Sequence, residues 1–101
     1  MSGFIQIIEF STAKIDEFDA LVEELMTEME GKMLVRRSIE TEDRDNPGRY
    51  MTIVEFDSYE EAMENSRNPT VTRFAERFAS LSEAPVAFHN LNVRNTYESA
   101  T

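Results

Sequence analysis

Several kinds of chemistry are excluded by what the chain lacks. It contains no cysteine and no tryptophan, and it has one histidine in 101 residues. Without cysteine, the chain cannot build a disulfide framework, a thiol nucleophile or a cysteine-ligated zinc or iron–sulfur site. A lone histidine with no Ser or Asp at a recognisable spacing gives no support for a nucleophilic triad. We therefore expect no metal site and no other cofactor.

Positive charge is also scarce. Ten Lys and Arg residues stand against twenty Asp and Glu residues, and the formal net charge is −10. Nucleic acids and anionic membranes both attract proteins through a basic face, which this composition disfavours. The sequence shows no leader-like start and no apolar run of membrane-spanning length. We expect a cytoplasmic protein that binds neither nucleic acid nor membranes, with the acidic stretch 15–30 forming a solvated helix face.

Three segments of the first half of the chain read as strands. Residues 4–10 and 49–56 are apolar at both odd and even positions, as in strands that are covered on both faces. Residues 33–41 alternate instead, which is typical of a strand with one wetter face. In that alternation Val35 and Ile39 are expected to share the apolar face.

Helix starts and ends are marked by residues with a known mechanism. Residues 15–29 carry apolar side chains at steps of three and four, which predicts a helix that Gly31 ends. Ser58 begins a capping box, so a short second helix should follow it. Asn68 followed by Pro69 is another helix start, because Asn caps and Pro suits the first helical position. The second helical region should therefore be broken between these two signals.

The order of the elements predicts the fold class. A last strand at 86–93 and a tail at 96–101 complete one domain that spans residues 1–101. We expect an α+β, ferredoxin-like βαββαβ unit, in which a four-stranded antiparallel sheet has both helical regions on one face. The first and third strands should be central. Because helices cover one face only, the apolar residues of the other face favour a homodimer whose sheets face each other.

Few side chains carry chemistry, and each has a structural reading beside the functional one. The Gln6 amide lies in an apolar strand and must find a partner if it is buried. Tyr50, Phe56 and Phe74 are suited to line an apolar pocket, although most aromatic residues of so small a domain belong to its core. His89 lies within the last strand, where packing or a hydrogen bond is the stronger reading and a role as base the weaker one.

A longer motif supports a family resemblance. The run RYMTIVEFDSYEEA at residues 49–62, followed by Asn68-Pro69 and Phe74-Ala75, resembles the antibiotic biosynthesis monooxygenase superfamily of dimeric α+β barrels. The resemblance extends over the element order of residues 4–93. It implies a homodimer in which each subunit holds a pocket between sheet and helices. Some members oxygenate aromatic polyketide or quinol substrates without metal or flavin, and others bind and degrade haem.

The haem-degrading pattern is largely missing. By position, Gln6, Phe56 and Asn65 match the Asn, Trp and axial His that haem-degrading members carry. Many other members have His near the proline of the helix break, where this chain has Thr70. Gln6 keeps an amide, whereas Phe56 lacks the aromatic N–H of Trp and Asn65 lacks the imidazole that would bind iron. Without an axial ligand haem lacks its usual anchor, so haem degradation is disfavoured.

The leading hypothesis is a cofactor-independent monooxygenase, or a related isomerase or cyclase, that acts on a small aromatic or polyketide-like molecule. In such chemistry an electron-rich substrate reduces oxygen itself, and the protein positions it and stabilises its anion. A non-catalytic protein that binds an apolar ligand, and a member with a filled pocket and a structural role, remain alternatives. The expected pocket residues are Gln6, Tyr50, Phe56, Asn65, Phe74 and His89.

Overall fold

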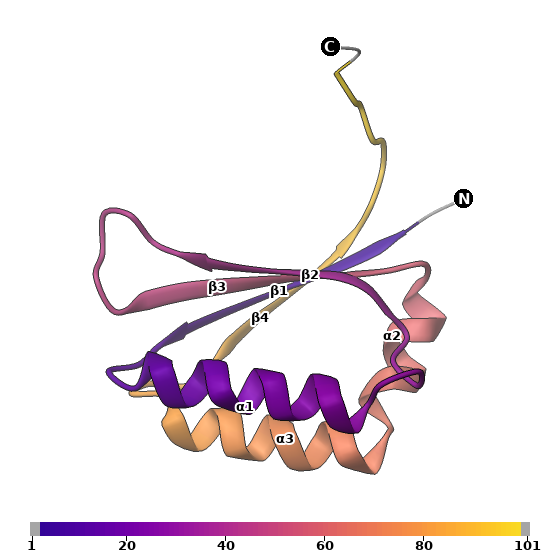
Figure 1. Ribbon diagram of the computed structural model, residues 1–101. Helices are drawn as coiled ribbons and strands as arrows, with labels where there is room; N and C mark the ends of the chain where they lie inside the picture. The colour runs from indigo at the N-terminus through magenta and orange to yellow at the C-terminus, as the bar shows by residue number, and fades with distance from the viewer. Residues whose placement is uncertain (1–2, 100–101) are drawn as a thin grey trace.

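The computed structural model describes residues 3–99, which form one antiparallel sheet with its helices on one side (Figure 1). The sheet order is β2-β3-β1-β4, so the first and third strands are central. The predicted α+β fold is confirmed. The strands are β1 (Phe4–Ser11), β2 (Val35–Glu42), β3 (Arg49–Phe56) and β4 (Ala87–Asn92), and the helices are α1 (Ile15–Glu28), α2 (Tyr59–Ser66) and α3 (Pro69–Leu81).

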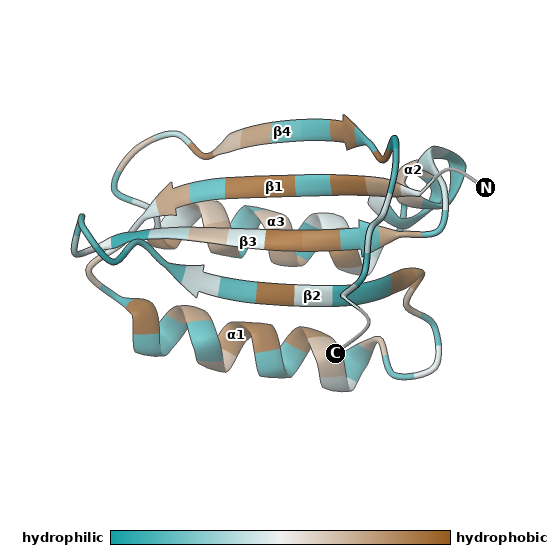
Figure 2. Ribbon diagram, turned by 90° about the horizontal axis from the view of Figure 1, so that it is seen from above, coloured by the Kyte–Doolittle hydropathy of each residue, from teal (hydrophilic) through white to brown (hydrophobic). Residues whose placement is uncertain are grey.

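The helices form a single layer. Figure 1 shows α1 and α3 lying side by side beneath the sheet, with α2 at one end, and Figure 2 shows α3 behind β1 and β3. The segment after β4 leaves the sheet on the side away from the helices (Figure 1). Within the expected tail, residues 96–99 have no helix or strand, and residues 100–101 lie outside the described part of the chain.

The predicted helix signals act as expected. The Ser58 hydroxyl accepts a hydrogen bond from the backbone N–H of Glu61 at 3.1 Å, which begins α2. The Asn68 side-chain oxygen accepts one from the N–H of Thr70 at 2.8 Å, which begins α3. Gly31, just beyond α1, has a φ of 77°, a conformation that only glycine adopts at no cost. These local signals explain why the second helical region is broken.

The helix-facing side of the sheet is identified by Phe10. Its ring stacks on Phe18 of α1 with a centroid distance of 4.3 Å, and on Tyr50 of β3 at 5.6 Å. Residues that pair across neighbouring strands share a face, and side chains alternate along each strand. The registers therefore direct the even-numbered residues of β1, β3 and β4 toward the helices.

The second strand corrects one expectation. Its register with β3 shifts between Val35 and Arg37, because an irregularity at Arg36 inserts one residue. Val35 pairs with Phe56 on the helix-facing side, whereas Ile39 pairs with Ile53 on the opposite side. The two were predicted to share a face, and that prediction is wrong because the bulge exchanges the parity of all later residues in β2.

Two aromatic clusters hold the helix layer against the sheet. At one end of the sheet, Phe4, Phe56 and Ala62 are buried together, with Val35 and Val54 packed against them. At the other end, Phe10 stacks on both Tyr50 and Phe18, and the Phe78 ring lies tilted against Phe18. The middle of the helix-facing side of the sheet, where Gln6 lies, is between these two clusters.

Candidate functional site

Three expected site residues share the helix-facing side. Gln6, Tyr50 and Phe56 all lie at even positions of β1 and β3, so their side chains point toward the helices. Phe56 and Tyr50 belong to opposite aromatic clusters, and Gln6 lies between them. Phe74 of α3 is fully buried, with no exposed surface. It serves as core rather than as an open pocket wall.

His89 does not join this group. It pairs with Ile7, which places its side chain on the side of the sheet away from the helices. There its Nε2 lies 3.2 Å from Oε2 of Glu9. The sequence left the facing of β4 open because its polar and apolar residues are mixed. The pairing with β1 decides it and separates His89 from the other expected site residues.

Asn65 has an unusual environment. It lies in the last turn of α2, next to the break before α3, and its side-chain oxygen is buried without a hydrogen-bond partner. A buried acceptor left unpaired costs roughly 1–3 kcal/mol, and native proteins retain few of them. A ligand that supplies an O–H or N–H donor would satisfy this oxygen.

Between the two aromatic clusters, the helix-facing side carries polar residues beside the apolar Ile8, Val54 and Phe88. The Gln6 amide Nε2 donates to the Asn90 side-chain oxygen at 3.0 Å, and the Thr52 hydroxyl lies 3.4 Å from Oε1 of Glu40. We call this region the polar middle, and it consists of Gln6, Ser38, Glu40, Thr52 and Asn90. A carboxamide has two N–H donors and an acceptor oxygen, so the amide pair can orient a hydroxyl or carbonyl group.

Glu40 is a residue of this region that sequence reasoning missed. Glu40 keeps part of its surface exposed, and its partial burial, followed by the nearby Asp19 carboxylate, raises its pKa above the ordinary value, while the Thr52 hydroxyl partly opposes the shift. Its signal in the sequence, one Glu in an alternating strand, is indistinguishable from that of a solvated residue. Only the bulge in β2 and the position of α1 reveal which way it faces.

Tyr50 is a poor proton acceptor. Burial, followed by the negative charges of Glu42, Asp19 and Asp16, raises the pKa of the Tyr50 phenol above its ordinary value of 10.0. The phenol therefore stays protonated at neutral pH. It can donate a hydrogen bond, but it does not provide a phenolate base.

The haem-binding pattern finds no support in this geometry. Asn65, at the position matched to the axial ligand, presents a carboxamide oxygen instead of an imidazole. His89, the one histidine of the sequence, lies on the opposite side of the sheet. The residues therefore do not fit haem. Among residues 3–99 no group of three or more His, Asp or Glu side chains is placed to hold a metal ion.

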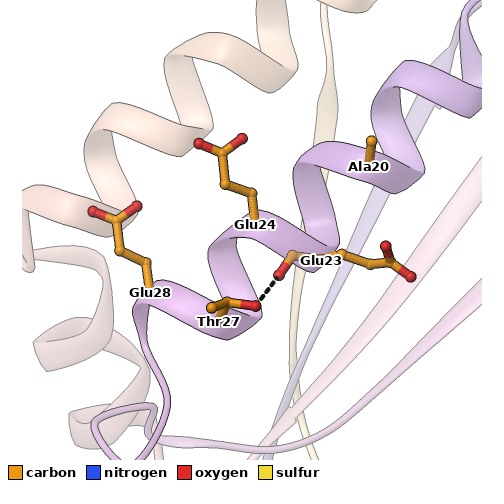
Figure 3. Close-up of a pocket in the computed structure, with 5 residues that line it drawn as sticks. All are labelled: Ala20, Glu23, Glu24, Thr27 and Glu28. Carbon is orange, nitrogen blue, oxygen red and sulfur yellow. Dashed lines mark hydrogen bonds between the residues drawn. The ribbon is translucent and has the colours of Figure 1, made fainter.

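Two surface hollows lie away from the polar middle. The larger, of about 420 Å³, is an open depression along α1, and Figure 3 shows Glu24 and Glu28 pointing from it toward α3. These carboxylates pair with Arg77 and Arg73 at 3.2 and 2.6 Å, so they join the two helices. The smaller hollow, of about 80 Å³, lies by the β2–β3 hairpin and is lined by Glu9, Thr41, Asp43, Arg49, Tyr50 and Met51. Of the expected site residues, only Tyr50 lines either hollow.

The side of the sheet away from the helices, here called the outer face, is apolar at its centre. Ile39, Met51 and Leu91 have 37%, 38% and 43% of their surface exposed. The outer face consists of Ile5, Ile7, Glu9, Arg37, Ile39, Thr41, Met51, Ile53, Glu55, Ala87, His89 and Leu91. No helix of residues 3–99 is both long and apolar enough to cross a bilayer.

Comparison with known proteins identifies a matching family and several structures of the same fold. The sequence profile of a family described as a domain of unknown function, DUF1330, matches residues 6–88. None of the curated proteins matches the chain. Among solved structures, SnoaB, a cofactor-independent oxygenase from Streptomyces nogalater, is similar with a TM-score of 0.79 and 13% identity, over 97% of this chain and 98% of that one.

Two further structures are similar over nearly their whole length. Rv0793 from Mycobacterium tuberculosis has a TM-score of 0.72 and 18% identity, with 98% of this chain and 99% of that one covered. A protein from Deinococcus radiodurans, proposed to be an antibiotic biosynthesis monooxygenase, has a TM-score of 0.77 and 12% identity, with 97% and 99% covered. At these identities the likeness shows a shared fold. The predicted resemblance to the antibiotic biosynthesis monooxygenase fold is thereby confirmed.

Proposed function

The chain belongs to the DUF1330 family, and we propose that it binds a small aromatic or polyketide-like molecule between its sheet and helices and oxygenates it without a cofactor. The observation that carries this proposal is the polar middle, which lies between two aromatic clusters on the helix-facing side of a monooxygenase-like fold. Aromatic ends suit a flat ring system, and a few polar groups between them suit its oxygen substituents.

The buried oxygen of Asn65 adds support. Its lack of a partner is explained if a bound ligand donates a hydrogen bond to it. A hydroxyl group of a phenol or an enol provides such a donor. The amide pair of Gln6 and Asn90 offers both donors and an acceptor for a second oxygen of the ligand.

The proposed reaction balances without a cofactor. A CH₂ group activated by neighbouring rings or carbonyls loses a proton, and the resulting carbanion passes one electron to O₂. The carbon radical and superoxide combine into a peroxide anion, which takes up a proton to give a hydroperoxide, and elimination of water then leaves a carbonyl. One oxygen atom of O₂ enters the product and the other leaves as water. The side chains position the substrate and stabilise its anion.

We further propose that the protein is a homodimer joined through the outer face. The whole chain carries a net charge of −10, so most of its surface repels a second copy. The outer face is an exception, because Glu55 pairs with Arg37 at 2.7 Å and Glu9 lies 3.2 Å from His89. A face that is apolar at its centre, and whose Glu9 and Glu55 carboxylates lie against neighbouring polar side chains, is suited to meet its own copy across a two-fold axis.

Anthrone, a tricyclic compound with an acidic central CH₂ group, is a direct probe of the oxygenation. With chelator and catalase present, we expect enzyme-dependent oxygen consumption and one ¹⁸O atom in the anthraquinone formed under ¹⁸O₂. Gln6→Ala and Asn65→Ala should each lower the rate roughly 10- to 100-fold, because each removes a hydrogen bond to the substrate. Asn95→Ala, an exposed amide beyond β4, is the matched control and should keep the rate.

A non-catalytic binding protein is the second candidate. It is favoured by the absence of a histidine base on the helix-facing side and by the raised pKa of Tyr50. In that case anthrone or a dihydroxyaromatic compound binds, and oxygen consumption stays at background. A folded parent protein that neither binds nor reacts with these compounds would contradict both functions.

A further inference from the structure

Glu40 has a defined place on the helix-facing side. Glu40 of β2 pairs directly with Thr52 of β3. The next pair on this face is Ser38 with Val54, and Val54 also pairs with Gln6 of β1. Glu40 and Gln6 are therefore two strands and one pair apart, or roughly 12 Å between Cα atoms at standard sheet spacings. Side chains that reach inward from both positions can contact opposite ends of a molecule with two or three fused rings.

The surroundings of Glu40 keep its carboxylate available as an acceptor. The Thr52 hydroxyl is its hydrogen-bond partner at 3.4 Å, which is a long and weak contact. Asp19 of α1 faces it with like charge, and Glu42 lies two residues further along the same strand and face. Within residues 3–99 no Lys, Arg or His forms an ion pair with Glu40.

Asp19 of α1 faces Glu40 as a like charge, and the remaining candidate proton acceptors are excluded from this place. Carboxamides are very weak bases, so Gln6, Asn65 and Asn90 can orient a substrate but cannot deprotonate it. His89 lies on the outer face beside Glu9. The Tyr50 phenol stays protonated at neutral pH. Glu42 shares the face but lies at the Tyr50 end of the sheet, beyond the polar middle.

We infer that Glu40 is the proton acceptor of the site, taking a proton from the activated CH₂ or hydroxyl group of a two- or three-ring substrate that Gln6 holds at its other end. This inference rests on the proposed function. The C–H or O–H bond breaks, its electron pair stays on the substrate, and the proton moves to a Glu40 carboxylate oxygen. The substrate anion then reduces O₂, the co-reactant, and Glu40 returns the proton to the peroxide intermediate.

The charge of the site agrees with this role. Proton transfer from a neutral substrate to Glu40 moves one negative charge without adding another. A substrate that arrives as an anion would meet Glu40 and Asp19 together and be repelled. The site should therefore select uncharged hydroxyaromatic or diketone-like molecules over carboxylates and phosphate esters. A carboxylate that holds its proton more tightly is also the stronger base.

The test is the pH dependence of kcat/KM for anthrone in the full chain. In the parent, kcat/KM should fall at low pH as Glu40 becomes protonated, which gives the profile an acid limb. Glu40→Gln should lose this limb, and its kcat/KM should be lower by a factor of roughly 10² to 10⁴. Glu40→Asp should restore part of the rate, because it keeps the carboxylate. Glu42→Gln is the matched control and should retain the limb. A Glu40→Gln protein with the parent rate and limb would overturn the inference while leaving the oxygenation in place.

A second readout does not depend on oxygen. The absorbance of bound 4-nitrophenol reports its ionisation. A carboxylate that accepts a hydrogen bond from the phenol hydroxyl raises the apparent pKa of the bound phenol. We expect this pKa to be raised in the parent and in Glu42→Gln, and to fall toward that of free 4-nitrophenol in Glu40→Gln. Equal values in all three proteins would overturn the role of Glu40, whatever the anthrone assay shows. If the parent raises the pKa of bound 4-nitrophenol but consumes no oxygen with anthrone, Glu40 contacts the ligand and the proposed oxygenation is wrong.

Discussion

The hydroxyl of Thr12 donates a 2.7 Å hydrogen bond to the backbone carbonyl of Leu81, and it also accepts one from the N–H of Lys14 at 2.9 Å. Thr12 is buried, and its own N–H donates to the carbonyl of Gly48 at 3.1 Å. One side chain thus connects the start of α1 with the end of α3. Its backbone adds the β2–β3 hairpin to the same junction.

Thr12→Val should lower the free energy of unfolding by roughly 1–3 kcal/mol, because it leaves the part-buried Leu81 carbonyl and Lys14 N–H without this partner. Urea unfolding followed by circular dichroism measures this change. Thr72→Val is the matched control, since the exposed Thr72 hydroxyl makes a longer bond of 3.3 Å to the carbonyl of Ser66. The control should change stability by no more than about 0.5 kcal/mol. Equal losses in both proteins would contradict the role of Thr12.

Asn65→Ala should separate stability from ligand binding. Removing a buried, unpartnered oxygen relieves a desolvation cost of roughly 1–3 kcal/mol, which offsets the packing that is lost. We therefore expect the melting temperature to stay near that of the parent or to rise, while anthrone binding measured by calorimetry weakens. A large loss of stability would show that the oxygen has a partner within the folded chain.

Glu40→Gln should raise stability at neutral pH and not at low pH. The folded-state pKa of Glu40 lies above its unfolded value, so its charged form disfavours the folded state. This penalty is absent below the unfolded pKa and grows as pH rises through the folded pKa. Urea unfolding at pH 7 and at pH 3.5 should show a gain only at the higher value. A gain of equal size at both values would exclude ionisation as its cause.

Ile53→Glu should convert the proposed dimer into a monomer. Ile53 lies between Ile7 and Ile39 on the outer face, and a two-fold axis would bring two such substitutions into one interface. Sedimentation velocity at micromolar concentration measures the change, and circular dichroism checks that the monomer stays folded. Met26→Glu, an apolar residue of α1 that is 52% exposed, is the control and should leave the dimer intact. A monomeric parent protein would contradict the proposal directly.

Haem should not bind specifically. Titration of the parent should show no Soret band that saturates at one haem per subunit, because the position matched to the axial ligand holds Asn65. A saturating band that disappears on changing a single residue near Asn65 would show that the assignment is wrong.

Much of the fold could be predicted from the sequence because its signals act over short distances. The caps at Ser58 and Asn68, and the left-handed conformation of Gly31, depend on a few neighbouring residues. The two-sided apolar pattern of residues 4–10 and 49–56 indicated the central strands in the same way. Packing did not need to be known for any of these predictions.

The facing of single side chains was decided only by the tertiary structure. An extra residue at Arg36 exchanges the faces of β2, so Ile39 joins the outer face and Glu40 turns toward α1. The pairing of β4 with β1 directs His89 away from the helices. A strand's side chains alternate whatever its partners are, but the face that meets the helices depends on register, and register depends on residues far apart in the chain. For this reason the sequence determined the elements and their order, while the tertiary structure determined which polar groups can meet a ligand.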